Sequence, residues 1–448
     1  MSRYLPFLFA VAAWAQSNVV AVRNATIHPA SGPAIENGTL VVRNGLIEAV
    51  GASINVPADA WVIDGKGLHV YPGLIDSLSK WGLSAAPAEP PGRGGGGGGG
   101  RPSGAPPSAG EGSTPNIQFL DDGGPEDRPS NTSWVKAADL VQPADRSIVS
   151  ARNAGFTTAI VFPTSGIFAG QGSAVNLAGE RAGDMVVSSP AGLYISVSSR
   201  NFSAFPGSLM GSIAYVRQIY LDAEHYKQAK AMYAQNPRGL QRPAYDRALE
   251  GVLEAPRILL PASRKVEVDR MLRFGKELKT PFILYGATEA WRAAGSLKGA
   301  NIPVLVNLRW PERDRDADPD AKDSLRTLET REMAPSGPAA LAKDGVTFAF
   351  YASGLDRAAD VKRAVKKAVE AGLSKDDALR AMTLNAAKIF GLDDRIGSLE
   401  AGKIGNVMIT DAEWFEDRAR VKFVFVDGKK FEPAPEAEAA KPTAGRTE

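Results

Sequence analysis

The sequence is poor in the residue types that most often carry chemistry. Its 448 residues include no cysteine, which excludes disulfide bonds, a thiol nucleophile and a thiolate metal site. Only three histidines occur, His28, His69 and His225. The net charge is only +2, acidic and basic residues are interspersed, and no long apolar run could span a bilayer. We therefore expect neither a nucleic-acid partner nor a membrane partner.

Residues 1–15 have the pattern of a signal peptide. Arg3 gives a short positive start, an apolar run follows from Leu5 to Ala13, and Ala13-Trp14-Ala15 is a small-x-small cleavage site. The apolar run is too short to cross a bilayer. We therefore expect cleavage before Gln16 and an exported mature protein, periplasmic or extracellular.

Both ends of the mature chain are rich in short β patterns. In the N-terminal part, the hairpin signal Asn44-Gly45 joins two apolar-rich runs. Near the C-terminus, strand patterns recur at 407–411 and 423–428. From these residues alone, the N-terminal strands could be a small independent β domain.

A low-complexity segment occupies residues 84–131, with an unbroken glycine run from Gly94 to Gly100. Such a composition buries too little apolar surface to offset the entropy of ordering it. A phosphate-binding loop is disfavoured because no Gly-Lys-Ser/Thr follows the glycines. We expect a disordered insertion here and a disordered tail at 433–448.

Beyond the insertion, strand and helix patterns alternate, as a parallel α/β barrel requires. The strand patterns lie at 156–162, 174–177, 257–260, 282–285, 304–307 and 346–350. Helix patterns lie at 209–234, 266–278 and 288–297, and a glycine-rich loop is predicted at 166–172. A last helix is predicted to open at Ser374 with a capping-box-like start and to run to Ala387.

The junction between the β-rich N-terminus and the barrel carries the most specific pattern, GKGLHVYPGLIDSLSKWGL from Gly65 to Leu83. Its Pro72-Gly73-Leu74-Ile75-Asp76 core, the run 396–403 and the helix ending in Thr383-Leu384-Asn385-Ala386-Ala387 resemble the amidohydrolase superfamily, imidazolonepropionase/dihydroorotase type. The resemblance implies an α/β fold. A (β/α)8 TIM-like barrel would span 71–394, and a small β-sandwich domain would combine 16–70 with 395–432. It also implies hydrolysis of amide or cyclic-amide C–N bonds.

The resemblance further implies zinc or another divalent metal at the barrel mouth. Its ligands would be two histidines after the first strand, one histidine each after the fifth and sixth, and an aspartate after the eighth. Such a metal lowers the pKa of a bound water. Here these positions hold Leu78, Lys80, Pro261, Tyr285 and Ser353. We therefore expect no metal cofactor and no metal-dependent catalysis.

The remaining candidate donors do not rebuild such a site. The three histidines fall outside the strand ends, so we interpret them as surface or structural residues. A carboxylate-only site for calcium or magnesium could use the acid-rich loop 312–318. Its alternating arginines favour a solvated, self-paired loop instead.

Two metal-free alternatives involve the end of the first barrel strand. Ser77 and Lys80 match the Ser-x-x-Lys string of serine acylases, but that motif works on a helix, where the two residues share a face. Lys80 could instead be a base or Schiff-base amine of depressed pKa. We favour a third interpretation, in which Lys80 compensates carboxylates such as Asp76 in a vacated metal site. The weak catalytic candidates are therefore Asp76, Lys80 and Glu289.

The sequence thus predicts an exported amidohydrolase-like protein that lacks the metal ligands and is catalytically degenerate. We expect it to bind a small molecule in the barrel mouth, or to support an active amidohydrolase partner or a homo-oligomer. The alternative is an active hydrolase with a metal-independent or atypical site around Asp76 and Lys80.

Overall fold

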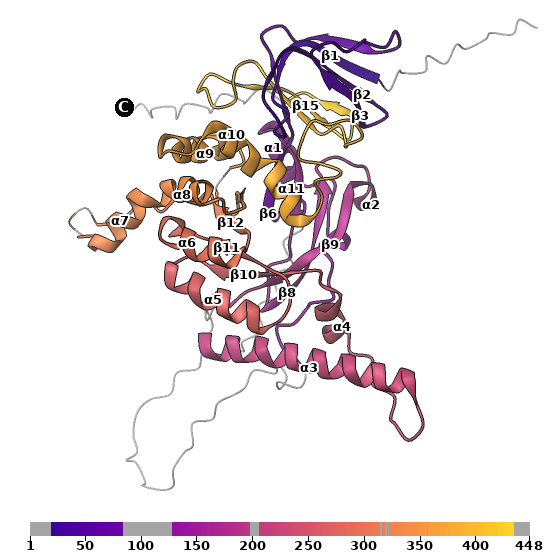
Figure 1. Ribbon diagram of the computed structural model, residues 1–448, viewed down its shortest axis with the longest axis vertical. Coiled ribbons are helices and arrows are strands. Elements are labelled where there is room, and N and C mark those ends of the chain that lie inside the picture. Colours follow the sequence, from indigo (N-terminus) through magenta and orange to yellow (C-terminus); the bar gives the residue numbers. More distant parts are fainter. Residues whose placement is uncertain are drawn as a thin grey trace, which may run out of the picture.

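The computed structural model describes residues 19–83, 128–197, 206–313, 316–318, 320, 322–355 and 357–433. The predicted signal peptide, all of the predicted insertion up to residue 127, and the predicted tail after residue 433 lie outside these ranges. Within them, the chain forms two eight-stranded sheets, one above the other in Figure 1. In the described ranges, no helix is long and apolar enough to cross a membrane.

The first sheet is built from both ends of the chain, coloured indigo and yellow in Figure 1. The N-terminal part gives β1 (Val19–Ile27), β2 (Ile35–Arg43), β3 (Leu46–Gly51), β4 (Trp61–Asp64) and β5 (His69–Pro72). The C-terminal part gives β14 (Val407–Thr410), β15 (Val421–Val426) and β16 (Lys429–Phe431). β5 pairs in parallel with β1 and antiparallel with β14, so it joins the two halves. The prediction that both chain ends share one β unit is confirmed.

The second sheet nearly closes into a barrel. Its strands follow chain order: β6 (Leu74–Ser79), β7 (Phe156–Val161), β8 (Phe168–Asn176), β9 (Val186–Ile195), β10 (Ile258–Ala262), β11 (Phe282–Gly286), β12 (Val304–Asn307) and β13 (Phe348–Tyr351). Two side-chain hydrogen bonds cross the seam between β6 and β13. The Ser77 hydroxyl donates to the Phe350 carbonyl at 2.6 Å, and the Ala352 N–H donates to Asp76 Oδ1 at 3.0 Å. The predicted eight-stranded barrel is confirmed.

The helices are α1 (Arg146–Asn153), α2 (Ala182–Met185), α3 (Leu209–Gln235), α4 (Arg247–Glu254), α5 (Lys265–Glu277), α6 (Ala290–Ala300), α7 (Leu325–Met333), α8 (Gly337–Asp344), α9 (Asp360–Glu370), α10 (Lys375–Met382) and α11 (Leu384–Phe390). In Figure 1, α5, α6, α8, α9 and α10 lie along one side of the barrel sheet, α2 and α4 lie on the other side, and α3 runs below it. The three helices predicted between residues 209 and 297 correspond to α3, α5 and α6.

One strand runs against the expected direction. The segment 166–172 was predicted as a loop, but from Phe168 onward it belongs to β8, which is antiparallel to both β7 and β9. Only residues 162–167 separate β7 from β8, too few for the crossover that a parallel pair needs. The chain therefore turns back directly and β7 and β8 form an antiparallel hairpin. As a result, the barrel is not strictly parallel.

The predicted last helix is divided in two. α10 begins after Ser374, whose hydroxyl accepts from the Asp377 N–H at 3.0 Å, as the capping pattern indicated. At Thr383, however, φ is −139° and ψ is −93°, which ends α10 and starts α11. The Thr383 hydroxyl donates to the Leu379 carbonyl at 2.6 Å, a back-bond that bends helices. The prediction of one continuous helix to Ala387 is therefore wrong.

α11 and the first sheet cover the end of the barrel where its strands begin. The Asn385 side chain donates to the carbonyl of Phe348, the first residue of β13, at 3.1 Å. Asn406, just before β14, donates to Thr158 on β7 at 3.0 Å and to Asn176 on β8 at 2.8 Å. The opposite end, where most strands finish, is left for a functional site.

Candidate functional site

Aromatic side chains fill much of the barrel interior. The rings of Tyr194 and Tyr285 stack with centroids 5.0 Å apart, and Phe162 lies 6.1 Å from Tyr194. The Tyr285 hydroxyl donates to the Ile195 carbonyl at 3.1 Å. Burial raises the pKa of Tyr194, Tyr285 and Tyr351 above the ordinary tyrosine value. These hydroxyls therefore stay neutral at physiological pH.

The five positions that the sequence resemblance assigns to metal ligands are spread over this end of the barrel. Leu78 is buried in the interior apolar cluster, against which Tyr285 also packs. Pro261 is half-buried on β10, opposite Tyr285 on β11. Ser353 is half-buried in the turn after β13, and Lys80 is exposed just after β6.

These side chains do not fit a divalent metal. Leu78 and Pro261 offer no side-chain donor atom, and Lys80 offers a cation. Across the described ranges, no three histidine, aspartate or glutamate side chains are arranged to hold a metal. A tightly held catalytic metal needs three converging protein ligands.

The histidines lie away from the barrel mouth. His28 Nε2 and His69 Nδ1 are 3.1 Å apart at the first sheet, and His28 stacks on Tyr71 with ring centroids 4.4 Å apart. Burial, and then the neighbouring His69, lower the pKa of His28. His225 is exposed on α3.

Asp76 is a buried carboxyl in the middle of β6. Its side chain accepts the Ala352 N–H, and the residue is only 1% exposed. Burial raises its pKa to about 7, with hydrogen bonds from Ala352, Ser79 and Leu78 opposing the rise. Lys80 is exposed. It and Asp76 both lie in the described ranges, and they form no ion pair. Asp76 can therefore exchange a proton near neutral pH, without help from the lysine.

Glu289 is held by groups at the start of α5 and on α7. It accepts the Lys265 N–H at 2.9 Å and an Arg326 N–H at 3.0 Å. Burial raises the pKa of Glu289, but these hydrogen bonds outweigh it and keep the pKa below the usual glutamate value. This arrangement suits a charged, structural carboxylate, not a general acid.

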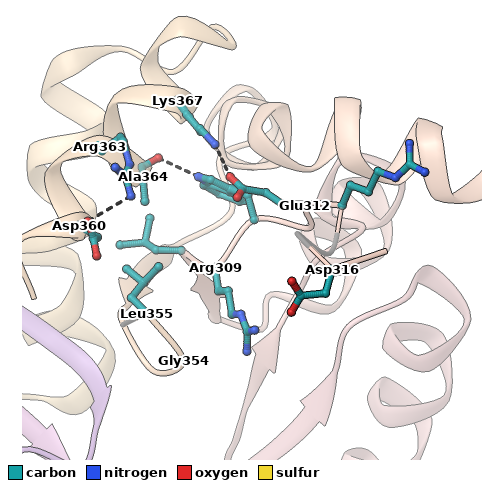
Figure 2. Close-up of a pocket in the computed structure, with 12 residues that line it drawn as sticks. Arg309, Glu312, Asp316, Gly354, Leu355, Asp360, Arg363, Ala364 and Lys367 are labelled. Atoms are coloured by element: carbon teal, nitrogen blue, oxygen red, sulfur yellow. Dashed lines mark hydrogen bonds and ion pairs between the residues drawn. The ribbon is translucent and has the colours of Figure 1, made fainter. Parts of the chain in front are cut away.

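A pocket of about 570 Å³ lies at the C-terminal ends of β12 and β13. Figure 2 shows it between the loop that follows β12, the turn that follows β13, and α9. Its walls are rich in charge of both signs: Arg309, Glu312, Arg313, Asp316, Asp360, Arg363 and Lys367. The sequence interpretation treated 312–318 as a self-paired loop and missed this pocket. The available signal was that two strand ends of the barrel supply adjacent loops on the face where barrels bind ligands.

Part of this wall is internally paired, but these pairs involve α9 and the residues before it, not acids and arginines within 312–318. Lys367 on α9 lies 2.5 Å from the Glu312 carboxylate. Asp360 pairs with Arg357 at 3.2 Å and with Arg363 at 3.1 Å. The arrangement offers a polar cavity, not a dry catalytic cleft.

Comparison with known proteins supports the fold. Residues 332–431, from the end of α7 to the end of β16, match the model of the amidohydrolase family. No curated protein matches the chain. An amidohydrolase from Thermotoga maritima MSB8 is similar over 92% of this chain and 100% of its own, with 24% identity and a TM-score of 0.71. Molinate hydrolase is similar over 97% of this chain and 100% of its own, with 15% identity and a TM-score of 0.51.

Proposed function

We propose that this chain, which belongs to the amidohydrolase superfamily, is an exported small-molecule-binding member that does not work as a metallohydrolase. One observation carries the proposal. The positions that would supply metal ligands hold Leu78, Lys80, Pro261, Tyr285 and Ser353, and they form no converging donor set. Without such a set, the barrel has no means to activate a metal-bound water.

The binding part of the proposal rests on the pocket beside β12 and β13. Its volume of about 570 Å³ lies within the roughly 300–1,000 Å³ of small-molecule sites. It lies on the C-terminal face, where barrel proteins place their ligands. The signal-peptide pattern of residues 1–15 supports export, so the ligand would be one that is present outside the cytoplasm.

The metal content of the purified mature protein tests the first half. We expect far less than one zinc, nickel, manganese or iron per chain by elemental analysis, and the same melting temperature with and without chelator. As a control, a Leu78→His/Lys80→His double variant should remain inactive, because Pro261, Tyr285 and Ser353 still supply no ligands. About one metal per chain, lost together with hydrolytic activity on chelation, would show the proposal to be wrong.

A thermal-shift panel of neutral, cationic and anionic small molecules tests the second half. A ligand at 100 times its Kd stabilises a folded protein by about 2.7 kcal/mol, which a melting curve resolves. We expect at least one chemical class to raise the melting temperature in a saturable way. If no class does so, the protein is not a small-molecule binder, and co-purification should then show whether it supports an amidohydrolase partner or assembles with itself.

A second candidate function is hydrolysis through Asp76 without a metal. The observation that favours it is the buried carboxyl with a pKa of about 7, close to the value that suits a general base. An amidase and esterase screen of the wild type and of Asp76→Asn decides it. Activity that rises through pH 7 and disappears in Asp76→Asn would establish this alternative, whereas inactivity of both proteins would remove it.

A further inference from the structure

The loop after β12 presents one arginine in a fixed place. The Asn307 side chain accepts the Arg309 N–H at 2.8 Å, and Trp310 beside it is buried, with its indole N–H donating to the Ala364 carbonyl at 2.8 Å. These bonds tie both flanks of Arg309 to the barrel and to α9. The Arg309 side chain itself is exposed and lines the pocket.

The guanidinium of Arg309 has no acidic partner among the described residues, whereas two carboxylates of the pocket do have partners. Glu312 is engaged by Lys367, and Asp360 by Arg357 and Arg363. In Figure 2, Arg309 extends past Gly354, away from the Lys367–Glu312 pair. Its planar set of N–H donors is therefore available to a ligand.

Gly354 leaves room for this side chain. A Cβ at Gly354 would lie 3.2 Å from Arg309 Cδ and 3.6 Å from Arg309 Nη1. The residue also has φ +92°, a conformation that suits glycine. The turn after β13 thus forms a shallow floor on which the arginine stem rests.

The charge of the pocket selects among anions. Among the described residues, four cationic and three acidic side chains line it, an excess of one positive charge. One excess charge suits a monoanion better than a phosphate dianion, which the three carboxylates would repel. A carboxylate also matches the fork geometry of a guanidinium.

We infer that this pocket binds organic monocarboxylates and that Arg309 holds the carboxylate. The inference rests on the proposed function, because it names the ligand class of the same site. It extends that function from binding in general to recognition of one charged group.

Calorimetry with matched acids and amides tests the inference. The probes are N-acetylglycine, N-acetyl-leucine and N-acetylphenylalanine, each as the free acid and as the primary amide, with inorganic phosphate alongside. We expect at least one acid to bind at least 10-fold more tightly than its amide and than phosphate. Arg309→Gln should weaken that acid roughly 10- to 100-fold, the range for hydrogen bonds to charged groups, and should leave the amide unchanged.

Arg270→Gln is the matched control, since Arg270 is exposed on α5 and does not line the pocket. It should leave all affinities unchanged, and both variants should keep the wild-type melting temperature. The inference is overturned if acids and amides bind equally, if phosphate binds most tightly, if no acid binds, or if Arg309→Gln has no effect. In each of these cases, the proposed function still stands if a neutral or cationic compound stabilises the protein. It fails separately if no compound of any charge does.

Discussion

The two ends of the barrel are built in contrasting ways. At the end where the strands begin, Asn406 links the loop before β14 to β7 and β8 through buried, uncharged hydrogen bonds. At the other end, the loop after β12 and the helix α9 carry seven charged side chains around an open pocket. The family match, residues 332–431, covers α11 and β14 at the first end and also Gly354 and α9 at the second.

The contrast distinguishes an end of the barrel that is closed by packing from an end that is open at the pocket. Packing and buried hydrogen bonds at the starts of the strands contribute to stability, whereas catalysis and binding depend on the loops at their C-terminal ends. In this chain, Leu78 belongs to the interior apolar cluster and Tyr285 packs against it; both are positions that the resemblance assigns to metal ligands. If the contrast is real, changes at the two ends should differ in kind and in size.

The largest effect should come from removing the C-terminal strands. Deleting residues 395–448 takes away β14, which pairs with β5 from Val407–Pro72 to Thr410–His69, together with the Asn406 links. The remaining strands lose their partners, so we expect an insoluble or unfolded product by solubility and circular dichroism. Deleting only 434–448 is the control and should leave folding unchanged. A cooperatively folded product of the longer deletion would break the comparison.

At the end of the barrel where the strands finish, Asp76 should make the stability of the protein depend on pH. Its pKa is about 7 in the folded protein against an ordinary value of 3.8, so between these values the folded state keeps a proton that the unfolded state has lost. The free energy of unfolding should therefore fall as pH rises from 4 to 7, by up to about 4 kcal/mol.

The difference between Asp76→Asn and wild type isolates this contribution, because other titrating groups cancel. Urea unfolding should show the variant gaining stability relative to wild type between pH 4 and pH 7, with no further gain above pH 8. A difference that stays flat over this range would mean that Asp76 is not buried as described.

Alanine substitutions at two glycines with nearly equal φ allow a direct comparison of the packing at the two ends of the barrel. Gly397 (φ +94°) lies beside α11, and Gly354 (φ +92°) lies in the pocket, so alanine costs a similar backbone strain of about 1–2 kcal/mol at each. A Cβ at Gly397 would meet Ala387 Cβ at 2.7 Å, whereas one at Gly354 meets the movable Arg309 side chain at 3.2 Å. Gly397→Ala should thus be less stable than Gly354→Ala by about 1–3 kcal/mol in urea unfolding. Equal losses would show that the two ends are packed alike.

The smallest effect is expected for Lys80→Ala. Lys80 is exposed, so the free energy of unfolding should change by less than about 0.5 kcal/mol. Lys403 is the counterpart near the first sheet, where its ammonium donates to Ser398 at 2.6 Å and pairs with Glu400. Lys403→Ala should cost about 0.5–1.5 kcal/mol, because it removes a hydrogen bond to the buried Ser398 hydroxyl, whereas the Glu400 carboxylate is reached by water. A large loss at Lys80 would place that lysine in the structural core of the site.

Local patterns were sufficient for most of the architecture. The β2–β3 hairpin follows from Asn44-Gly45, and α3, α5 and α6 follow from their apolar periodicity. The composite sheet and the barrel required motifs at both chain ends, because pairing of β5 with β14 joins residues more than 300 positions apart. The reversed β8 was missed because its glycines are typical of a loop.

The sequence by itself determined which donor atoms the barrel mouth has. Leucine, lysine, proline, tyrosine and serine at the five positions that the resemblance assigns to metal ligands are a matter of sequence, and no fold changes their chemistry. Only the tertiary structure decided what surrounds those positions: stacked tyrosines in the interior, a buried Asp76 with a raised pKa, and Arg309 over Gly354 at the rim. The physical reason is distance. Burial, stacking and charge balance depend on side chains that come from different strands, and neither periodicity nor spacing along the chain encodes which of them meet.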